Sequence, residues 1–119
     1  LKAKIDAGAD YVMTQPVFDD SAMKSIESYR YLIPVLPGVM VIRSTAHAER
    51  IAQVPGVNLP QRVIDNFRKY ADAGDQVKAG FDFAVRQAQT YRSEGWAGVY
   101  LMSPASVSAA KQVLKTLAE

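Results

Sequence analysis

Three short apolar segments, each followed by a turn and then by a helical pattern, constrain the fold more than any other feature of the sequence. The segments span residues 10–15, 33–42 and 98–102. Glycine or proline stands in or beside each of them, and each is too short for a typical helix, so each predicts a strand. The second segment is expected to be buried and to be interrupted or kinked at Pro37-Gly38.

Helical patterns with capping residues separate these strands. A side chain that can cap a helix precedes each pattern after the first strand: Asp19 or Asp20, Ser44, Asn58, Asp75 and Ser106. Glycines at positions 8, 74 and 95 are expected to follow the ends of helices. The last helix is expected to be buried through Val107, Ala110, Val113, Leu114 and Leu117. The predicted order is α-β-α-β-α-α-α-β-α.

This alternation of strands and helices predicts parallel strands joined by right-handed crossovers. Three such strands form either a small open sheet or part of a (β/α)8 barrel. A complete barrel needs about 250 residues, whereas this chain has 119. The chain therefore has room for one domain, residues 1–119, with about three βα units.

Composition excludes several classes of protein. Hydrophobic residues make up 49% of the chain and charged residues 22%, which predicts a folded globular protein. The net charge of +2 is too small to indicate a nucleic acid or a membrane surface as partner. No segment approaches the roughly 20 apolar residues of a membrane helix. The chain lacks cysteine, so we expect no disulfide and no thiolate metal site, and a reducing, cytoplasmic location.

The first residues read as the end of a helix. Leu1 and Ile5 are four residues apart, and Gly8 follows as a helix terminator. This pattern predicts a longer protein whose helix starts before Leu1. Removal of an initiator methionine is the alternative.

Ligands of parallel α/β folds bind at the carboxyl ends of the strands. The corresponding loops here are residues 14–19, 43–47 and 103–106. In the first loop, the Gln15 amide could donate and accept hydrogen bonds at the edge of a flat ring, and Phe18 could pack against that ring. Alternatively, Gln15 binds the backbone of its own loop and Phe18 belongs to the core.

Four motifs follow one another along the chain. The first motif has two parts, K-x-D-A-G-A-D at residues 4–10 and T-Q-x-x-F-D at residues 14–19. The other three are L-P-G-V-M at residues 36–40, G-V-N-L-P at residues 56–60 and G-W-A-G-V-Y-L-M at residues 95–102. In this order they resemble the sixth to eighth barrel strands of methylenetetrahydrofolate reductases, in particular members fused to a homocysteine S-methyltransferase domain. The resemblance implies the C-terminal portion of a TIM (β/α)8 barrel.

The resemblance also implies an activity. Members of this family use FAD and NAD(P)H to reduce 5,10-methylenetetrahydrofolate to 5-methyltetrahydrofolate in one-carbon metabolism and methionine biosynthesis. Gln15 matches a glutamine that contacts folate or nicotinamide, and a polar folate contact falls near His47. Lys4 matches a basic residue near the adenosine side of the flavin. Solvent-exposed side chains without a ligand are the alternative for Lys4 and His47.

Other positions depart from the family pattern. An arginine that meets the folate glutamate is replaced by the sequence of residues 103–106, unless Arg43 or Lys111 takes its role. The family's acidic residue and most flavin contacts lie on earlier strands, and Asp19 and Asp20 are expected to be caps. We therefore expect no catalytic residue and no metal ligand in this chain.

Three interpretations remain open at this point. The chain is an enzyme segment that is inactive without the rest of its barrel, a diverged binding or interaction module without reductase activity, or an unrelated small α/β domain. A partial barrel has two free strand edges and an uncovered sheet face. We therefore expect homo-oligomers if the chain exists alone.

Overall fold

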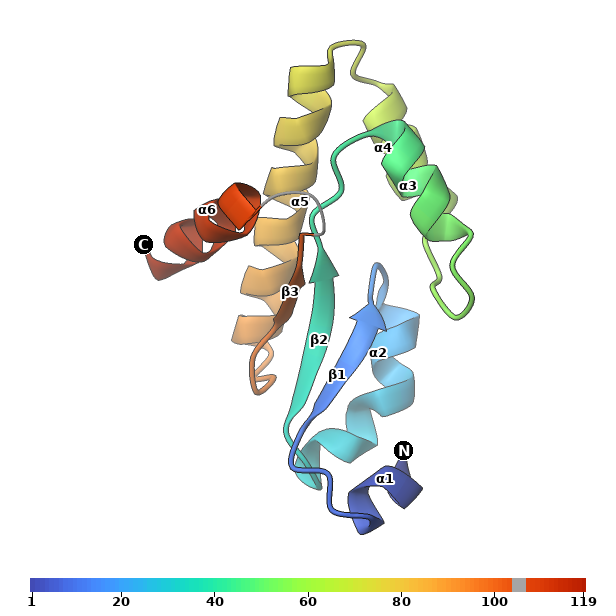
Figure 1. Ribbon diagram of the computed structural model, residues 1–119, viewed down its shortest axis with the longest axis vertical. Helices are drawn as coiled ribbons and strands as arrows, with labels where there is room; N and C mark the ends of the chain where they lie inside the picture. Colours follow the sequence, from blue (N-terminus) through green and yellow to red (C-terminus); the bar gives the residue numbers. More distant parts are fainter. Residues whose placement is uncertain (104–106) are drawn as a thin grey trace.

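The computed structural model describes residues 1–103 and 107–119, and its helices and strands follow the predicted order (Figure 1). The strands are β1 (Val12–Pro16), β2 (Val35–Met40) and β3 (Tyr100–Met102). The helices are α1 (Lys2–Asp6), α2 (Asp20–Ile26), the 3-10 helix η1 (Glu27–Tyr31), α3 (Thr45–Ala52), α4 (Gln61–Arg68), α5 (Ala73–Ser93) and α6 (Val107–Ala118).

The three strands form one parallel sheet in the order β1-β2-β3. The α/β class and the parallel strands predicted from the alternating pattern are therefore confirmed. The central strand, β2, continues through Pro37-Gly38, so of the interruption or kink expected at that pair, the interruption does not occur. β2 is therefore the central strand, with a parallel neighbour on each side.

Local capping chemistry explains several helix boundaries. The Asp19 carboxylate accepts a hydrogen bond from the Ala22 N–H (3.2 Å), and the Ser44 hydroxyl accepts one from the His47 N–H (3.0 Å). Each bond satisfies a backbone donor that the first turn of a helix leaves free. Gly8 and Gly95 follow their helices with positive φ, as predicted.

Two predicted caps are wrong. Asn58 does not cap α4, because its amide donates a hydrogen bond to Asp19 (2.8 Å) and Pro60 occupies the capping position. Asp72, and not Asp75, caps α5 by accepting hydrogen bonds from the N–H groups of residues 74 and 75. Gly74 therefore lies in the first turn of α5 and does not end α4. Ser106 lies outside the described residues.

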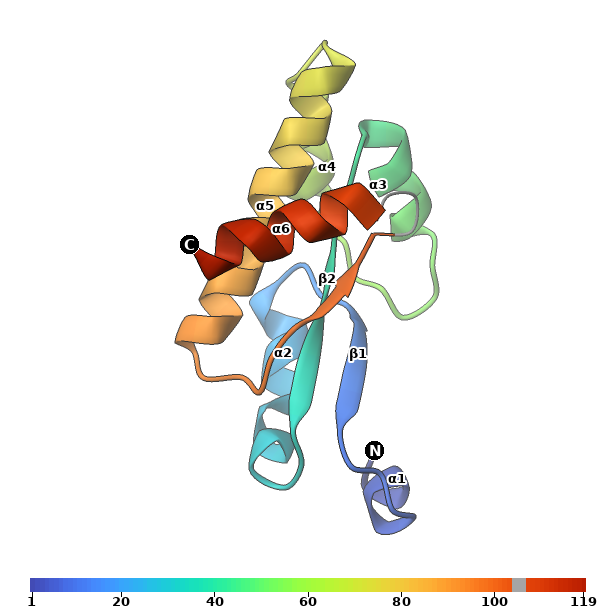
Figure 2. The same ribbon diagram turned by 60° about the vertical axis from the view of Figure 1, so that its left-hand side comes forward.

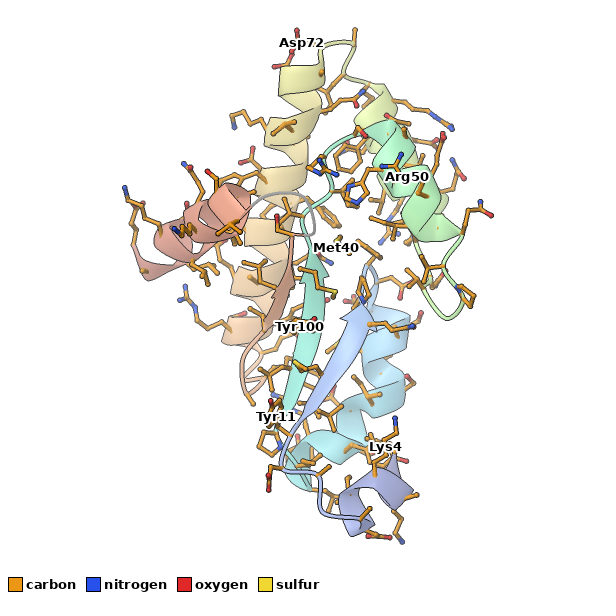
Figure 3. All side chains as sticks on the ribbon, in the orientation of Figure 1. Lys4, Tyr11, Met40, Arg50, Asp72 and Tyr100 are labelled. Atoms are coloured by element: carbon orange, nitrogen blue, oxygen red, sulfur yellow. The ribbon has the colours of Figure 1, made fainter. Side chains whose placement is uncertain are left out.

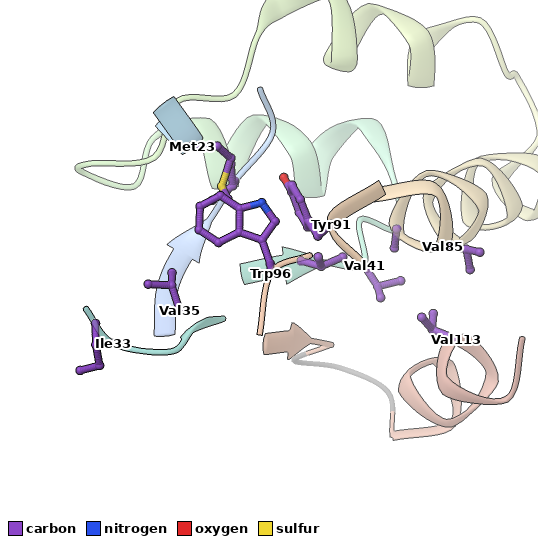
Figure 4. Close-up of a cluster of buried hydrophobic side chains, with 11 residues drawn as sticks. Met23, Ile33, Val35, Val41, Val85, Tyr91, Trp96 and Val113 are labelled. Carbon is purple, nitrogen blue, oxygen red and sulfur yellow. The ribbon is translucent and has the colours of Figure 1, made fainter. Parts of the chain in front are cut away.

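Helices cover one face of the sheet. Figure 1 shows α2 and α5 behind the strands, and Figure 2 shows α6 lying across α5. Val35, Val39 and Val41 of the central segment pack in one buried cluster with residues of α2, α5 and α6. Figure 4 shows Met23, Trp96 and Tyr91 in this cluster, together with the valines that meet between α5 and α6. This cluster fixes how the helices lie on the sheet.

Only part of the predicted apolar face of α6 is buried. Val113 is buried completely against the main cluster, but Val107 and Leu114 remain 71% and 55% exposed. The expectation of burial through both residues is therefore wrong for the chain as described. The cause is that α6 contacts α5 on one side and has no described neighbour on its other side.

Among residues 1–103 and 107–119, no helix lies on the opposite face of the sheet, as Figure 1 shows. Side chains on this open sheet face come from alternate positions of the three strands: Met13, Gln15, Leu36, Met40, Tyr100 and Met102. Met13 is 50% exposed and Tyr100 is 38% exposed. Figure 3 labels Met40 and Tyr100 on this side of the sheet. The open sheet face is thus largely apolar and carries one amide, that of Gln15, near the carboxyl end of β1.

A close backbone approach joins α5 to the segment that directly follows β2. Gly80 lies against the Ile42 carbonyl group, and a Cβ atom at this position would overlap the carbonyl oxygen. The Phe67 ring of α4 would be 3.4 Å away from the same Cβ atom. Only glycine allows α5 to pass so close to the strand.

Replacing Gly80 with alanine should lower the free energy of unfolding by about 2–3 kcal/mol, because the helix must move away from Ile42. Gly98→Ala is the matched control, since its new methyl group would meet Leu36 at an ordinary contact distance of 3.6 Å. Urea unfolding of both variants checks this prediction. Equal stability of the two variants would contradict it.

Candidate functional site

A bulge near the carboxyl end of β1 shapes the candidate site. Met13 pairs with Leu36, and Pro16 pairs with Gly38, so β1 advances three residues while β2 advances two. The Thr14 hydroxyl accepts a hydrogen bond from the Gly38 N–H (2.8 Å) and donates one to the Gln15 carbonyl (2.7 Å). A side chain therefore replaces a backbone acceptor at the bulge. Bulges of this kind redirect the side chains beside them.

The bulge requires glycine at position 38. A Cβ atom there would lie 2.7 Å from the Gln15 carbonyl oxygen and close to the methyl group of Met102. The backbones of β1 and β2 approach each other at this point because residue 38 has no side chain. Position 38 thus helps to hold the backbone of Gln15 in place.

The Gln15 side chain lies beside the loop between α3 and α4 (residues 53–60). Its Nε2 donates a long hydrogen bond to the Pro55 carbonyl (3.4 Å). Gly56 has a φ of 85°, and a Cβ atom there would lie 2.6 Å from Gln15 Oε1. The second anchor of this loop is the Asn58–Asp19 hydrogen bond. The amide of Gln15 is thus exposed and is held against a loop from a distant part of the sequence.

Phe18 lies in the core beside this loop. Its side chain is buried in a second cluster with residues of α3 and α4, and its ring stacks on Phe83 with 6.5 Å between centroids. Phe18 also lines a surface cavity of about 240 Å³, together with Gln87 and Tyr91. A role for Phe18 in ligand binding stays a prediction, and its packing role is evident.

His47 is buried. The alternative for this residue, a solvent-exposed side chain, is therefore wrong. Its side chain is 7% exposed, and its Nδ1 accepts a hydrogen bond from the Arg43 N–H (3.1 Å). Burial lowers the pKa of His47, and the positive charges of Arg43 and Arg50 lower it further. The imidazole is therefore neutral at pH 7 and closes the turn between β2 and α3.

The lowered pKa of His47 makes the stability of the fold depend on pH. The unfolded chain binds a proton at His47 near pH 6.5, whereas the folded chain resists that proton. The free energy of unfolding should therefore fall as the pH drops below about 6.5, until the lower pKa of the folded state is passed. Unfolding curves between pH 7.5 and 5 would measure this, and the pH dependence should be weaker in His47→Gln. If the pH dependence of stability is unchanged in His47→Gln, groups other than His47 cause it.

Lys4 does not lie near Gln15 within the described residues. It belongs to α1, at the amino end of β1, whereas Gln15 lies at the carboxyl end (Figure 3). Its side chain is exposed. The structure therefore separates the residue expected at the cofactor from the residues expected at the substrate.

Three further residues of the site could not be identified from the sequence: Thr14, Gly56 and Asn58. Their roles depend on the bulge and on a contact between segments about 40 positions apart. The Pro55-Gly56 pair did indicate a turn, but nothing local indicated that the turn meets Gln15. The open sheet face and the Gln15 amide together suit a flat ligand with a polar edge.

The position of Gln15 should depend on Gly56. Gly56→Ala places a side chain at positive φ and against Gln15 Oε1, so we expect a loss of about 1–2 kcal/mol in stability and a displaced amide. The side-chain NH2 signals of Gln15 in NMR spectra would report the displacement. Val54→Ala, an exposed position of the same loop, should leave these signals unchanged. Unmoved signals in Gly56→Ala would show that the loop does not position Gln15.

Comparison with known proteins gives the chain a family. The model of the family described as methylenetetrahydrofolate reductase matches residues 1–118. The chain is 28% identical to a probable methylenetetrahydrofolate reductase (NADPH) of Caenorhabditis elegans, over 98% of the chain and 19% of that protein. It is 29% identical to methylenetetrahydrofolate reductase (NADH) 1 of Arabidopsis thaliana, over 85% of the chain and 18% of that protein. The chain thus spans about a fifth of the length of these relatives.

A solved structure shares the fold. It is an uncharacterized protein from Clostridium thermocellum that binds two copies of 5-methyl-5,6,7,8-tetrahydrofolic acid. The TM-score is 0.61 at 18% sequence identity, and the match covers 98% of this chain and 45% of the other. The similarity supports the arrangement of helices and strands described above.

Proposed function

The chain belongs to the methylenetetrahydrofolate reductase family, and on that premise we propose that it forms part of a reductase that converts 5,10-methylenetetrahydrofolate to 5-methyltetrahydrofolate. The observation that carries the proposal is Gln15, whose exposed amide lies at the carboxyl end of β1 beside the open sheet face. The solved structure that shares this fold binds a methylated tetrahydrofolate, which supports a folate as the ligand.

In this proposal the three strands are the last strands of a (β/α)8 barrel, and the open sheet face is turned to the barrel interior. The sequential order of the parallel strands and the helices on one face are the features of such a barrel. The chain covers about a fifth of its relatives, so the remaining strands would come from other segments. We therefore expect residues 1–119 alone to lack reductase activity.

Gln15 would bind and orient the folate. Its amide can donate to and accept from the edge of the pterin ring once it leaves the Pro55 carbonyl, a bond whose 3.4 Å length makes it weak. The ring would then lie over the open sheet face near Met13 and Tyr100. Phe18 and His47 would act from the adjoining loops. Both are buried in the described chain, so contact with a ligand would need their loops to move.

FAD and NAD(P)H would supply the hydride chemistry of the complete protein. Lys4, the residue expected at the cofactor, fits an anionic group, because its side chain is exposed and has no ion pair among the described residues. The names of the relatives include both NADPH and NADH, so the proposal covers either nicotinamide.

A second candidate is a folate-binding module that does not reduce its ligand. Residues 103–106 read S-P-A-S and contain no arginine where the family pattern places one. Such a module would bind folate through Gln15 without oxidising NAD(P)H. Turnover by the complete protein distinguishes the two candidates.

We also propose that the protein is cytoplasmic and associates with itself. The exposed apolar residues of the open sheet face and of α6 would favour association if no other segment covered them.

Of the helices in residues 1–103 and 107–119, none has the length and apolar character needed to cross a bilayer.

Gln15→Ala in the complete protein should lower kcat/KM for 5,10-methylenetetrahydrofolate by about tenfold or more, because a buried polar edge of the ligand would lose its partner. Oxidation of NAD(P)H with and without the folate measures this effect. Gln89→Ala, an exposed glutamine of α5, is the control and should leave the rate unchanged. Equal rates for the two variants would remove Gln15 from the site, and a colourless protein without turnover would favour the binding module.

A further inference from the structure

A cavity on the helix-covered side of the sheet lies where β2 ends, between α5 and α6. Its volume is about 400 Å³. Val41 and two residues of α5, Val77 and Phe81, form apolar walls, and Gln112 of α6 faces them. Val41 itself belongs to the buried cluster under the sheet (Figure 4). The cavity is therefore on the opposite side of the sheet from Gln15.

Arg43 lines this cavity, and no ion pair joins its guanidinium to a described residue. Its Nε is buried and makes no hydrogen bond to any described residue. The hydrogen bond between Arg43 and His47 uses the backbone N–H of Arg43, not its guanidinium. A guanidinium stays protonated in proteins, and a buried charged donor without an acceptor is unfavourable. Arg43 thus places a cation without a described counter-ion at the wall of the cavity, which suits an anionic ligand.

The charge around the cavity favours an anion. Lys78 also lines the cavity, but Asp82 compensates its charge through an ion pair of 2.8 Å, so the favourable charge comes from Arg43. Neither aspartate nor glutamate is found among the lining residues in the described part of the chain. Arginine binds the two oxygens of a carboxylate or a phosphate with parallel hydrogen bonds. The apolar walls favour a ligand that carries such a group on an apolar body.

We propose that this cavity binds a small molecule with a carboxylate or a phosphate on an apolar body. Arg43 binds the oxyanion, and Val77 and Phe81 contact the apolar body. This site is separate from the proposed folate surface, because the sheet lies between them. Its occupation does not depend on the reductase proposal.

Binding of four simple probes to the purified protein tests the site. Benzoate and phenyl phosphate carry both the apolar body and the oxyanion, inorganic phosphate carries only the charge, and benzyl alcohol carries only the ring. Calorimetric titration should show that at least one of the first two probes binds more tightly than the last two. Tighter binding of benzoate than of phenyl phosphate identifies a carboxylate ligand. Tighter binding of phenyl phosphate identifies a phosphate ligand. If neither of the first two binds, the proposal is wrong.

Variants assign the binding to Arg43. Arg43→Gln should weaken binding by about tenfold or more, because it removes a charge-assisted hydrogen bond. Arg50→Gln is the matched control: it removes the same charge from an exposed position of α3 outside the cavity (Figure 3), and should leave the affinity within twofold. Val77→Asp, a change at an exposed residue, should also weaken binding by placing a negative charge at the cavity wall. The proposal fails if the Arg43→Gln and Val77→Asp variants both bind the probes with the affinity of the unchanged protein.

His47 supplies a second readout that a purely structural role of Arg43 would not change. His47 is the chain's single histidine, and the Arg43 charge lowers its pKa. A bound oxyanion would offset that charge, so the probes should raise the pKa of His47 followed by NMR. Arg50→Gln should raise this pKa without probe and preserve the further rise with probe. Probe binding that leaves the His47 titration unchanged would overturn the assignment to Arg43.

Discussion

The hydrogen bond from the Gly38 N–H to the Thr14 hydroxyl is the contact on which the candidate site depends. It lets β1 carry an extra residue against β2 without leaving a backbone donor unpaired. The absence of a side chain at Gly38 allows the Gln15 carbonyl to approach at this point. The Thr14 hydroxyl and Gly38, on neighbouring strands, thus determine where the Gln15 side chain projects from the sheet.

The two faces of the sheet have different roles. The covered face is rich in valine and packs on α2, α5 and α6, and Gly80 allows α5 to touch the end of β2. The open face carries methionine, tyrosine and the Gln15 amide at positions that alternate with the buried ones. The same strands therefore provide the core and a ligand surface, while the Arg43 cavity lies at the junction of β2 with the covering helices.

Much of the fold could be predicted from the sequence because the patterns are local. Apolar runs of strand length, capping side chains such as Asp19 and Ser44, and glycines after helices gave the order and most boundaries. The errors arose where a distant contact competes with a local one. Asn58 looks like a cap, but its amide binds Asp19 from another loop. The sequence predicted Gln15, Phe18, His47 and Lys4 as site residues, but not the bulge and the loop contact that hold Gln15, since both require the assembled sheet.

The most direct test of this account is a structure of the complete protein with 5-methyltetrahydrofolate bound. We predict that the pterin ring lies over the open sheet face, with its polar edge about 3 Å from the Gln15 carboxamide, and that Gln15 no longer contacts the Pro55 carbonyl. A folate bound elsewhere, with the Gln15–Pro55 contact intact, would contradict the account.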